Sequence, residues 1–139
     1  MKKKHLILIS SASFLIMFSC STRNLSEKYP YGYYSYVEHS KSGPLVCKGS
    51  LYIQKTDSNT FQGNWAVDVY RDRVGGNTQN GFLIGRIEND SVFIDLDPDY
   101  ERTDWTLAGK LEGNVISGDS EWKRYNGAFH NGLFTAIRE

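Results

Sequence analysis

The feature that most constrains the fold of this 139-residue chain is a period-two alternation of apolar residues between positions 103 and 138. Apolar or small residues recur at every second position in three successive sets: Trp105, Leu107, Gly109, Leu111; Ile116, Gly118, Ser120, Trp122; and Gly132, Phe134, Ala136, Arg138. Such alternation places each set on one face of a β-strand. Glycine is unusual inside a strand and indicates sharp bending. The pattern predicts three consecutive strands of a small closed β-barrel.

The preceding chain shows the same pattern, which predicts further strands over 32–37, 47–55, 61–70, 81–88 and 91–96. No helical period is sustained after the first 30 residues. Seven of the eight expected strands contain a glycine on the apolar face: Gly32, Gly49, Gly63, Gly85, Gly109, Gly118 and Gly132. A sheet that closes with few strands must coil strongly, and glycine relieves crowding where it bends. We therefore expect an all-β fold, an eight-stranded antiparallel up-and-down (meander) barrel.

The expected connections alternate in length. Short polar turns lie at 56–60, 89–90 and 112–114, and longer loops at 39–46, 71–80, 97–102 and 125–131. In a meander, alternate connections lie at opposite ends of the barrel. One end should therefore be closed by tight turns, and the other should present the loops, where binding residues are usually found.

Following each strand to the loop-bearing end gives the candidate ligand-binding residues, which are mostly aromatic: Tyr36, Trp65, Val67, Trp105, Trp122 and Phe134. The candidate rim residues are His39, Arg71, Tyr100, Arg124, Tyr125 and His130. An aromatic wall with few polar groups suits a small, partly apolar ligand. The alternative is that these side chains meet and fill the interior, as in other small eight-stranded barrels.

The first 30 residues lie outside this pattern. Three lysines at positions 2–4 precede an apolar run over 6–18, which is shorter than the roughly 20 residues of a membrane-spanning helix. Such a segment is typical of a signal peptide. The apolar run ends in Met17 and Phe18, and Ser19 and Cys20 come next. The stretch from Met17 to Cys20 resembles the lipobox of bacterial lipoproteins.

The lipobox resemblance implies cleavage before Cys20 and attachment of lipid to its thiol. The expected organisation is a signal peptide over 1–19, a lipidated cysteine and tether over 20–30, and a barrel domain over 31–139. Because Ser21, not aspartate, follows the cysteine, the resemblance implies the outer membrane. The tract after Cys20 is not acidic, which favours the periplasm-facing side of the cell envelope.

Charge and motifs exclude several classes of function. Losing three of 16 basic residues with the leader leaves 13 against 16 acidic residues, so no basic excess is available for nucleic acid. Cys47 has the parity of the core and no partner if Cys20 is lipidated, so we expect a small buried hydrophobe. The acidic residues around Pro98 do not fit a calcium loop. With no catalytic motif, metal site or cofactor fingerprint, we expect a non-enzymatic protein.

The expected meander is similar to the calycins, the group of lipocalins, fatty-acid-binding proteins and avidins. Their signature is a glycine and an aromatic residue on the first strand, packed against a basic residue on the last. Gly32, Tyr34 and Arg138 match these positions, with tyrosine in place of the usual tryptophan. An inward arginine requires a partner, and Tyr34 offers both a ring and a hydroxyl. These three residues are therefore expected to close the tight-turn end.

Taken together, the sequence predicts an outer-membrane-anchored lipoprotein that binds a small, partly apolar ligand at the open end of its barrel. Its expected partners are the lipid bilayer, through Cys20, and a small ligand or an envelope protein. The alternative is a protein-interaction or inhibitor module that uses the long loops of a filled barrel.

Overall fold

The computed structural model describes residues 29–70, 77–99, 103–124, 126–127 and 129–139. In these residues the chain forms strands and turns and no helix, so none of them belongs to a helix long and apolar enough to cross a membrane. The strands are β1 (Gly32–Ser40), β2 (Leu45–Lys55), β3 (Thr60–Val69), β4 (Asn77–Glu88), β5 (Ser91–Asp95), β6 (Thr103–Glu112), β7 (Val115–Arg124) and β8 (Phe129–Arg138).

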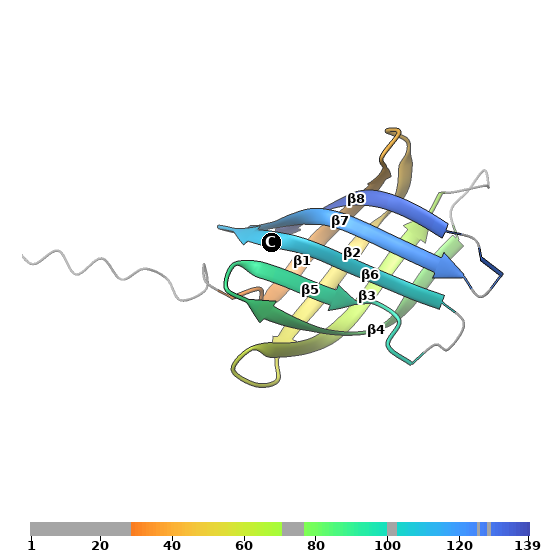
Figure 1. Cartoon of the computed structure of the whole chain (residues 1–139). Coiled ribbons are helices and arrows are strands. Elements are labelled where there is room, and N and C mark those ends of the chain that lie inside the picture. The colour runs from red at the N-terminus through yellow and green to blue at the C-terminus, as the bar shows by residue number, and fades with distance from the viewer. Residues whose placement is uncertain (1–28, 71–76, 100–102, 125, 128) are drawn as a thin grey trace, which may run out of the picture.

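Each strand pairs antiparallel with the next, and β8 pairs with β1, so the sheet closes into a barrel (Figure 1). The closing ladder runs from Tyr34 opposite Arg138 to Ser40 opposite Gly132. This arrangement confirms the predicted eight-stranded up-and-down barrel.

Three loops are shorter than the alternation predicted. One is the connection between β7 and β8, because β8 begins at Phe129, inside the predicted loop of residues 125–131. The connection between β1 and β2 spans only residues 41–44, and β4 begins at Asn77 instead of residue 81. Both extensions are hydrogen-bonded ladders of largely polar residues, such as the pairing of Val69 with Asn77. Apolar periodicity detects only the part of a strand that lines the core, so it missed these projecting ends.

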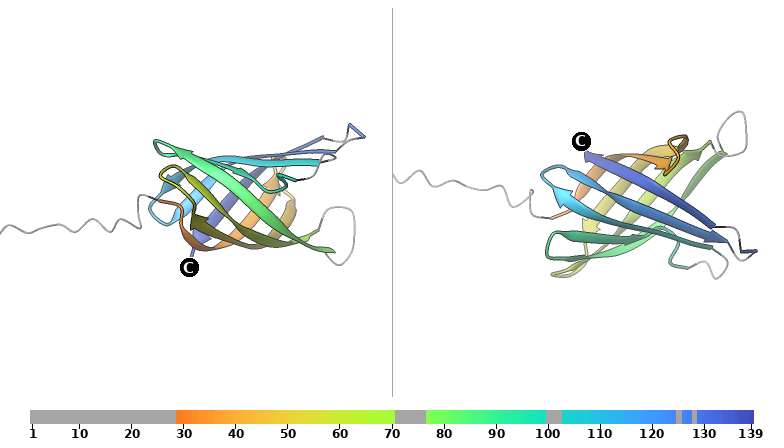
Figure 2. Two further views of the ribbon diagram at one scale, coloured as in Figure 1. Left: turned by 90° about the horizontal axis from the view of Figure 1, so that it is seen from below. Right: turned by 45° about the horizontal axis from the view of Figure 1, so that its top comes forward.

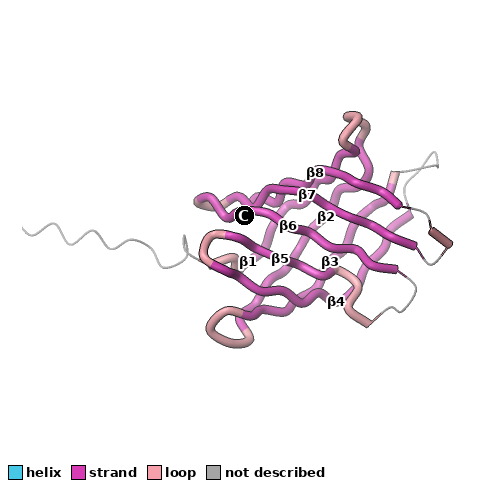
Figure 3. Tube along the Cα trace, viewed as in Figure 1, coloured by secondary structure: helices cyan, strands magenta, loops and turns pink. Residues whose placement is uncertain are grey.

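The turns between β2 and β3, β4 and β5, and β6 and β7 lie at one end of the barrel, together with Tyr29 and the C-terminus (Figures 1 and 2). The connection between β1 and β2 lies at the opposite end, as Figure 3 shows, and the described ends of the other strands that face it lie there too. The loop-bearing end and the tight-turn end are therefore distinct, as predicted.

Glycines allow close approach between neighbouring strands. A Cβ atom at Gly63 would collide with the carbonyl of Tyr52 on β2, and one at Gly118 would collide with that of Ala108 on β6. Both glycines thus lie where the backbones approach too closely for any side chain, as expected for a tightly coiled barrel.

Candidate functional site

Arg138 seals the tight-turn end. Its Nε and Nη2 donate to the hydroxyl of Tyr34 at 3.1 and 2.9 Å, and Nη2 also donates to the carbonyl of Tyr29 at 2.5 Å. The side chain of Arg138 packs 3.5 Å from the position of a Cβ on Gly32, whose φ of +131° favours glycine. Burial raises the pKa of Tyr34, and the hydrogen bond from Arg138 opposes that shift. The structure brings the three predicted closure residues together at this end of the barrel.

The three tryptophans form a cluster toward the loop-bearing end. The Trp65 and Trp105 rings meet edge to face with centroids 5.2 Å apart, and the Trp122 centroid lies 6.2 Å from that of Trp105. Trp65 and Trp105 are buried, whereas Trp122 is half-buried. The guanidinium of Arg124 lies over the ring of Trp122, 4.2 Å from the ring centroid. The tryptophans therefore face one another instead of lining a wide chamber.

The indole nitrogens of Trp65 and Trp105 differ in their hydrogen bonding. Trp65 Nε1 donates to the carbonyl of Leu96 at 2.5 Å and to that of Phe82 at 3.3 Å. Trp105 Nε1 is buried and has no hydrogen-bond partner among the described residues. Buried polar groups are usually satisfied, so an unpaired N–H at this position is unusual.

A buried carboxylate lies beside the cluster, and the sequence reasoning missed it. Glu38 is only 1% exposed. Its Oε2 accepts from the hydroxyl of Tyr36 at 2.7 Å and the thiol of Cys47 at 3.7 Å, and its Oε1 accepts from the hydroxyl of Ser120 at 2.6 Å. His130 Nε2 lies 3.5 Å from Oε1. Glu38 shares the parity of Tyr34 and Tyr36, so continuing the alternation by one step would have placed it inside.

These groups surround a small cavity of about 20 Å³. Its lining consists of Glu38, Val46, Val69, Gln79, Trp105, Trp122 and His130. A volume of this size holds about one water molecule. Of the two interpretations left open by the sequence, the filled interior describes this structure, with one water-sized cavity beside Glu38.

Burial determines the protonation of the donors to Glu38. The pKa of Tyr36 is raised well above its ordinary value, mainly because the side chain is buried and secondly because the Glu38 carboxyl lies nearby. The same two causes, in the same order, raise the pKa of the Cys47 thiol. Both groups stay protonated at neutral pH and act as donors. Cys47 is therefore a structural donor and not an activated nucleophile, which requires a lowered thiol pKa.

The predicted ligand-binding residues all face the interior, but at different depths. Tyr36 donates to Glu38, Trp105 and Trp122 line the cavity beside it, and Trp65 packs against Trp105. Phe134 stacks on Tyr36 with ring centroids 6.1 Å apart, and Val67 is 1% exposed; neither lines the cavity. They support the wall of the site without reaching it.

Both histidines were wrongly placed in loops. His39 belongs to β1 and is exposed, with Nδ1 3.1 Å from the carbonyl of Gly43. His130 belongs to β8 and is 8% exposed inside the barrel. The strands extend beyond the apolar pattern, and the parity of each histidine then decides its side of the wall. Arg124 ends β7 near the rim, whereas Cys20, Arg71, Tyr100 and Tyr125 lie outside the described residues.

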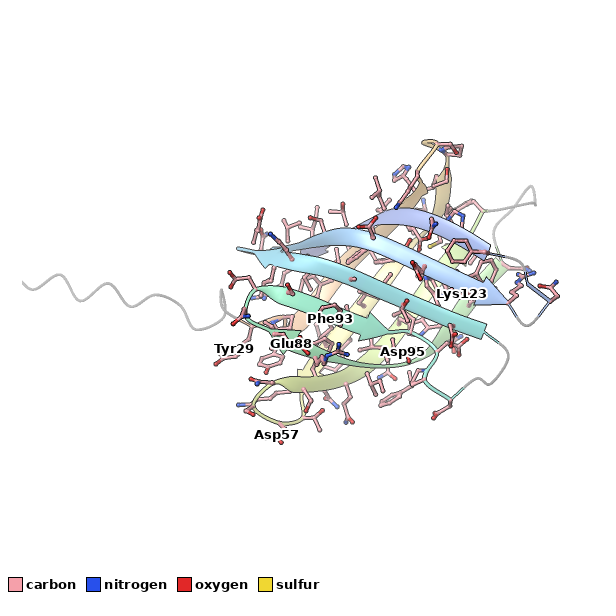
Figure 4. All side chains as sticks on the ribbon, viewed as in Figure 1. Tyr29, Asp57, Glu88, Phe93, Asp95 and Lys123 are labelled. Atoms are coloured by element: carbon pink, nitrogen blue, oxygen red, sulfur yellow. The ribbon has the colours of Figure 1, made fainter. Side chains whose placement is uncertain are left out.

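The barrel also has a groove on its outer wall, across β3 to β6. Its volume is about 580 Å³, and its lining includes Ile84, Arg86, Phe93, Asp95 and Thr106. Figure 4 shows Phe93 and Asp95 on this face. Arg86 stacks over the ring of Phe93 at 4.5 Å and pairs with Glu88 at 2.6 Å.

Among the described residues, no cluster of acidic, histidine or cysteine side chains suits a metal ion.

Comparisons with known proteins agree on the fold alone. No protein-family model and no curated protein matches the chain. Three solved structures are similar to it, and each covers 79% of this chain: EF1p2_mFAP2b bound to DFHBI (13% identity, 94% of that chain, TM-score 0.62), the redesigned β-barrel mFAP1 bound to DFHBI (11%, 94%, 0.58), and the redesigned β-barrel b11L5F_LGL (12%, 91%, 0.59). The protein thus belongs to the class of small closed antiparallel β-barrels.

Proposed function

We propose that this protein binds a small, partly apolar ligand at the loop-bearing end of its barrel. One observation supports this most: the buried, unpartnered Nε1 of Trp105 belongs to a residue that borders the Glu38 cavity. The site combines indole surface with a few convergent polar groups, which is the usual composition of small-molecule sites. Two barrels of similar fold are bound to DFHBI, so the architecture is compatible with such a ligand.

The ligand enters by displacing side chains at the mouth. The cavity of about 20 Å³ accommodates one small group, so the rest of the ligand needs space that Gln79 and Trp122 now occupy. Gln79 is exposed and Trp122 is half-buried, and neither is part of the fully buried core. Moving them is therefore less costly than opening the packed interior below.

Titration with DFHBI and with a long-chain fatty acid, followed by tryptophan emission, tests this proposal. We expect a saturable change with at least one probe. Trp105→Ala should weaken binding at least tenfold, whereas Tyr33→Ala, an exposed aromatic at the sealed end, should not. If no small, partly apolar probe, whether DFHBI, a fatty acid or an amine, gives a saturable change, or if Trp105→Ala binds as well as the unaltered chain, the proposal is wrong.

We also propose, from the leader resemblance, that lipid on Cys20 tethers the protein to the outer membrane. Tyr29, where the described chain begins, lies beside Arg138 at the sealed end. A tether joined there leaves the loop-bearing mouth facing away from the bilayer. Metabolic labelling with a fatty acid and separation of the two membranes test this: label and outer-membrane recovery should both disappear in Cys20→Ser. Retention of either by this variant would contradict the anchor.

A second candidate function is a non-enzymatic protein-interaction module, favoured by the outer groove of about 580 Å³ beside a nearly filled interior. Substituting Phe93→Ser should then abolish cross-linking to an envelope protein and leave the tryptophan site intact. Unchanged cross-linking would remove this candidate.

A further inference from the structure

We infer that the ligand is an organic cation, a small amine whose ammonium group is bound by Glu38 and whose apolar body contacts the tryptophans. This inference rests on the proposed function and adds the sign of the ligand's charge. It comes from three features of the site: the buried carboxylate, the indole surface and the size of the cavity.

The first feature is the charge of the site. Glu38 is 1% exposed, and the hydroxyl and thiol groups that donate to it are neutral. Among the described residues, the one basic group within 4 Å of its carboxylate is the imidazole of His130, at 3.5 Å. A buried carboxylate gains most from a cationic partner, because burial removes the screening effect of water. An anionic ligand would be repelled at the same position.

The second feature is the indole surface. Among aromatic side chains, tryptophan binds cations on its ring face most strongly. The guanidinium of Arg124 already occupies such a position on Trp122, 4.2 Å from the centroid. Trp105, which borders the same cavity as Glu38, extends this surface inward. Carboxylate and aromatic rings together therefore favour an amine with an apolar body.

The third feature is size. The cavity of about 20 Å³ beside Glu38 fits a group as large as a water molecule, and an ammonium nitrogen is of that size. The ammonium group is thus the part of the ligand that reaches the bottom of the site. The apolar body extends past Trp122 and Gln79 to the mouth.

Three size-matched probes test the charge: 2-phenylethylamine, 2-phenylethanol and 3-phenylpropionate, titrated calorimetrically at pH 7 into the full chain. We expect the amine to bind at least tenfold more tightly than the alcohol, and the acid most weakly. Glu38→Gln, which keeps the shape of the side chain, should abolish the preference for the amine. The matched control Glu121→Gln, exposed on β7, should retain it.

The outcomes separate this inference from the proposed function. If the unaltered chain binds the alcohol or the acid as tightly as the amine, or Glu38→Gln keeps the preference, the inference is wrong. If DFHBI or the fatty acid binds and the amine does not, the inference fails while the proposed function stands. If no probe of any kind binds, both fail.

Discussion

Trp65 and Trp105 offer a matched pair of substitutions that tests the hydrogen bonding of the site. The two residues are 7% and 6% exposed, and their rings touch. They differ in hydrogen bonding: Trp65 Nε1 donates to the carbonyls of Leu96 at 2.5 Å and Phe82 at 3.3 Å, and Trp105 Nε1 has no described partner. Replacing each by phenylalanine removes the same atoms from nearly the same environment, so the difference between the variants isolates the hydrogen bond.

The magnitudes follow from these contacts. Both variants lose similar ring area, but Trp65→Phe also loses a hydrogen bond and leaves the buried carbonyl of Leu96 without this donor, at a cost of about 1–3 kcal/mol. Trp105→Phe instead removes a buried, unsatisfied N–H, whose desolvation cost is also about 1–3 kcal/mol. Relief of that cost offsets part of the unfolding free energy lost with the packing. Trp65→Phe should therefore be less stable than Trp105→Phe by at least about 1 kcal/mol.

Urea unfolding followed by far-ultraviolet circular dichroism measures the difference without relying on tryptophan emission. Equal m-values in the two variants would show that the free energies are comparable. If the two substitutions destabilise equally, or if Trp105→Phe is the less stable variant, then Trp105 Nε1 has a partner inside the protein. Trp105 Nε1 would then not be a free donor for a ligand.

Three further predictions concern other parts of the barrel. Arg138→Met should destabilise the fold by about 1–3 kcal/mol in urea unfolding, because it leaves the buried hydroxyl of Tyr34 unpaired; a loss below about 0.5 kcal/mol would contradict the sealing role. Gly118→Ala should cost about 1–3 kcal/mol through its collision with the carbonyl of Ala108, and a neutral result would show that the strands can separate there. Because the pKa of Cys47 is raised on folding, its contribution to stability is complete below about pH 8.5 and is lost as pH rises. Under reducing conditions and above that pH, the unaltered chain should therefore lose about 1.4 kcal/mol more unfolding free energy per pH unit than Cys47→Ala does. Equal slopes of unfolding free energy against pH in the two proteins would refute this prediction.

Much of the fold followed from local sequence. Period-two alternation located all eight strands, and the inward glycines indicated closure because a tightly coiled sheet has no room for side chains where backbones meet. Strand ends were less accurate, as β1 and β4 show. The first residues of β4 pair through backbone hydrogen bonds outside the core, and the last three residues of β1 are polar, so neither end appears in the apolar pattern.

The candidate site was only partly accessible from sequence. Parity placed Tyr36, Trp105 and Trp122 inside, and it would have placed Glu38 there as well. It could not show that Glu38 meets Ser120, which is 82 residues away along the chain, or His130 from the adjacent β8. Contacts between side chains of different strands depend on the stagger of the closed sheet and on rotamers.

The sequence by itself thus determined an alternating chain with glycine bends and the inward side of each strand. These follow from backbone geometry, which repeats every two residues. Only the tertiary structure decided that the three tryptophans pack together, that one indole N–H remains unpaired, and that a carboxylate lies beside a water-sized cavity. Those features depend on distances across the interior, and such distances exist only once the barrel has closed.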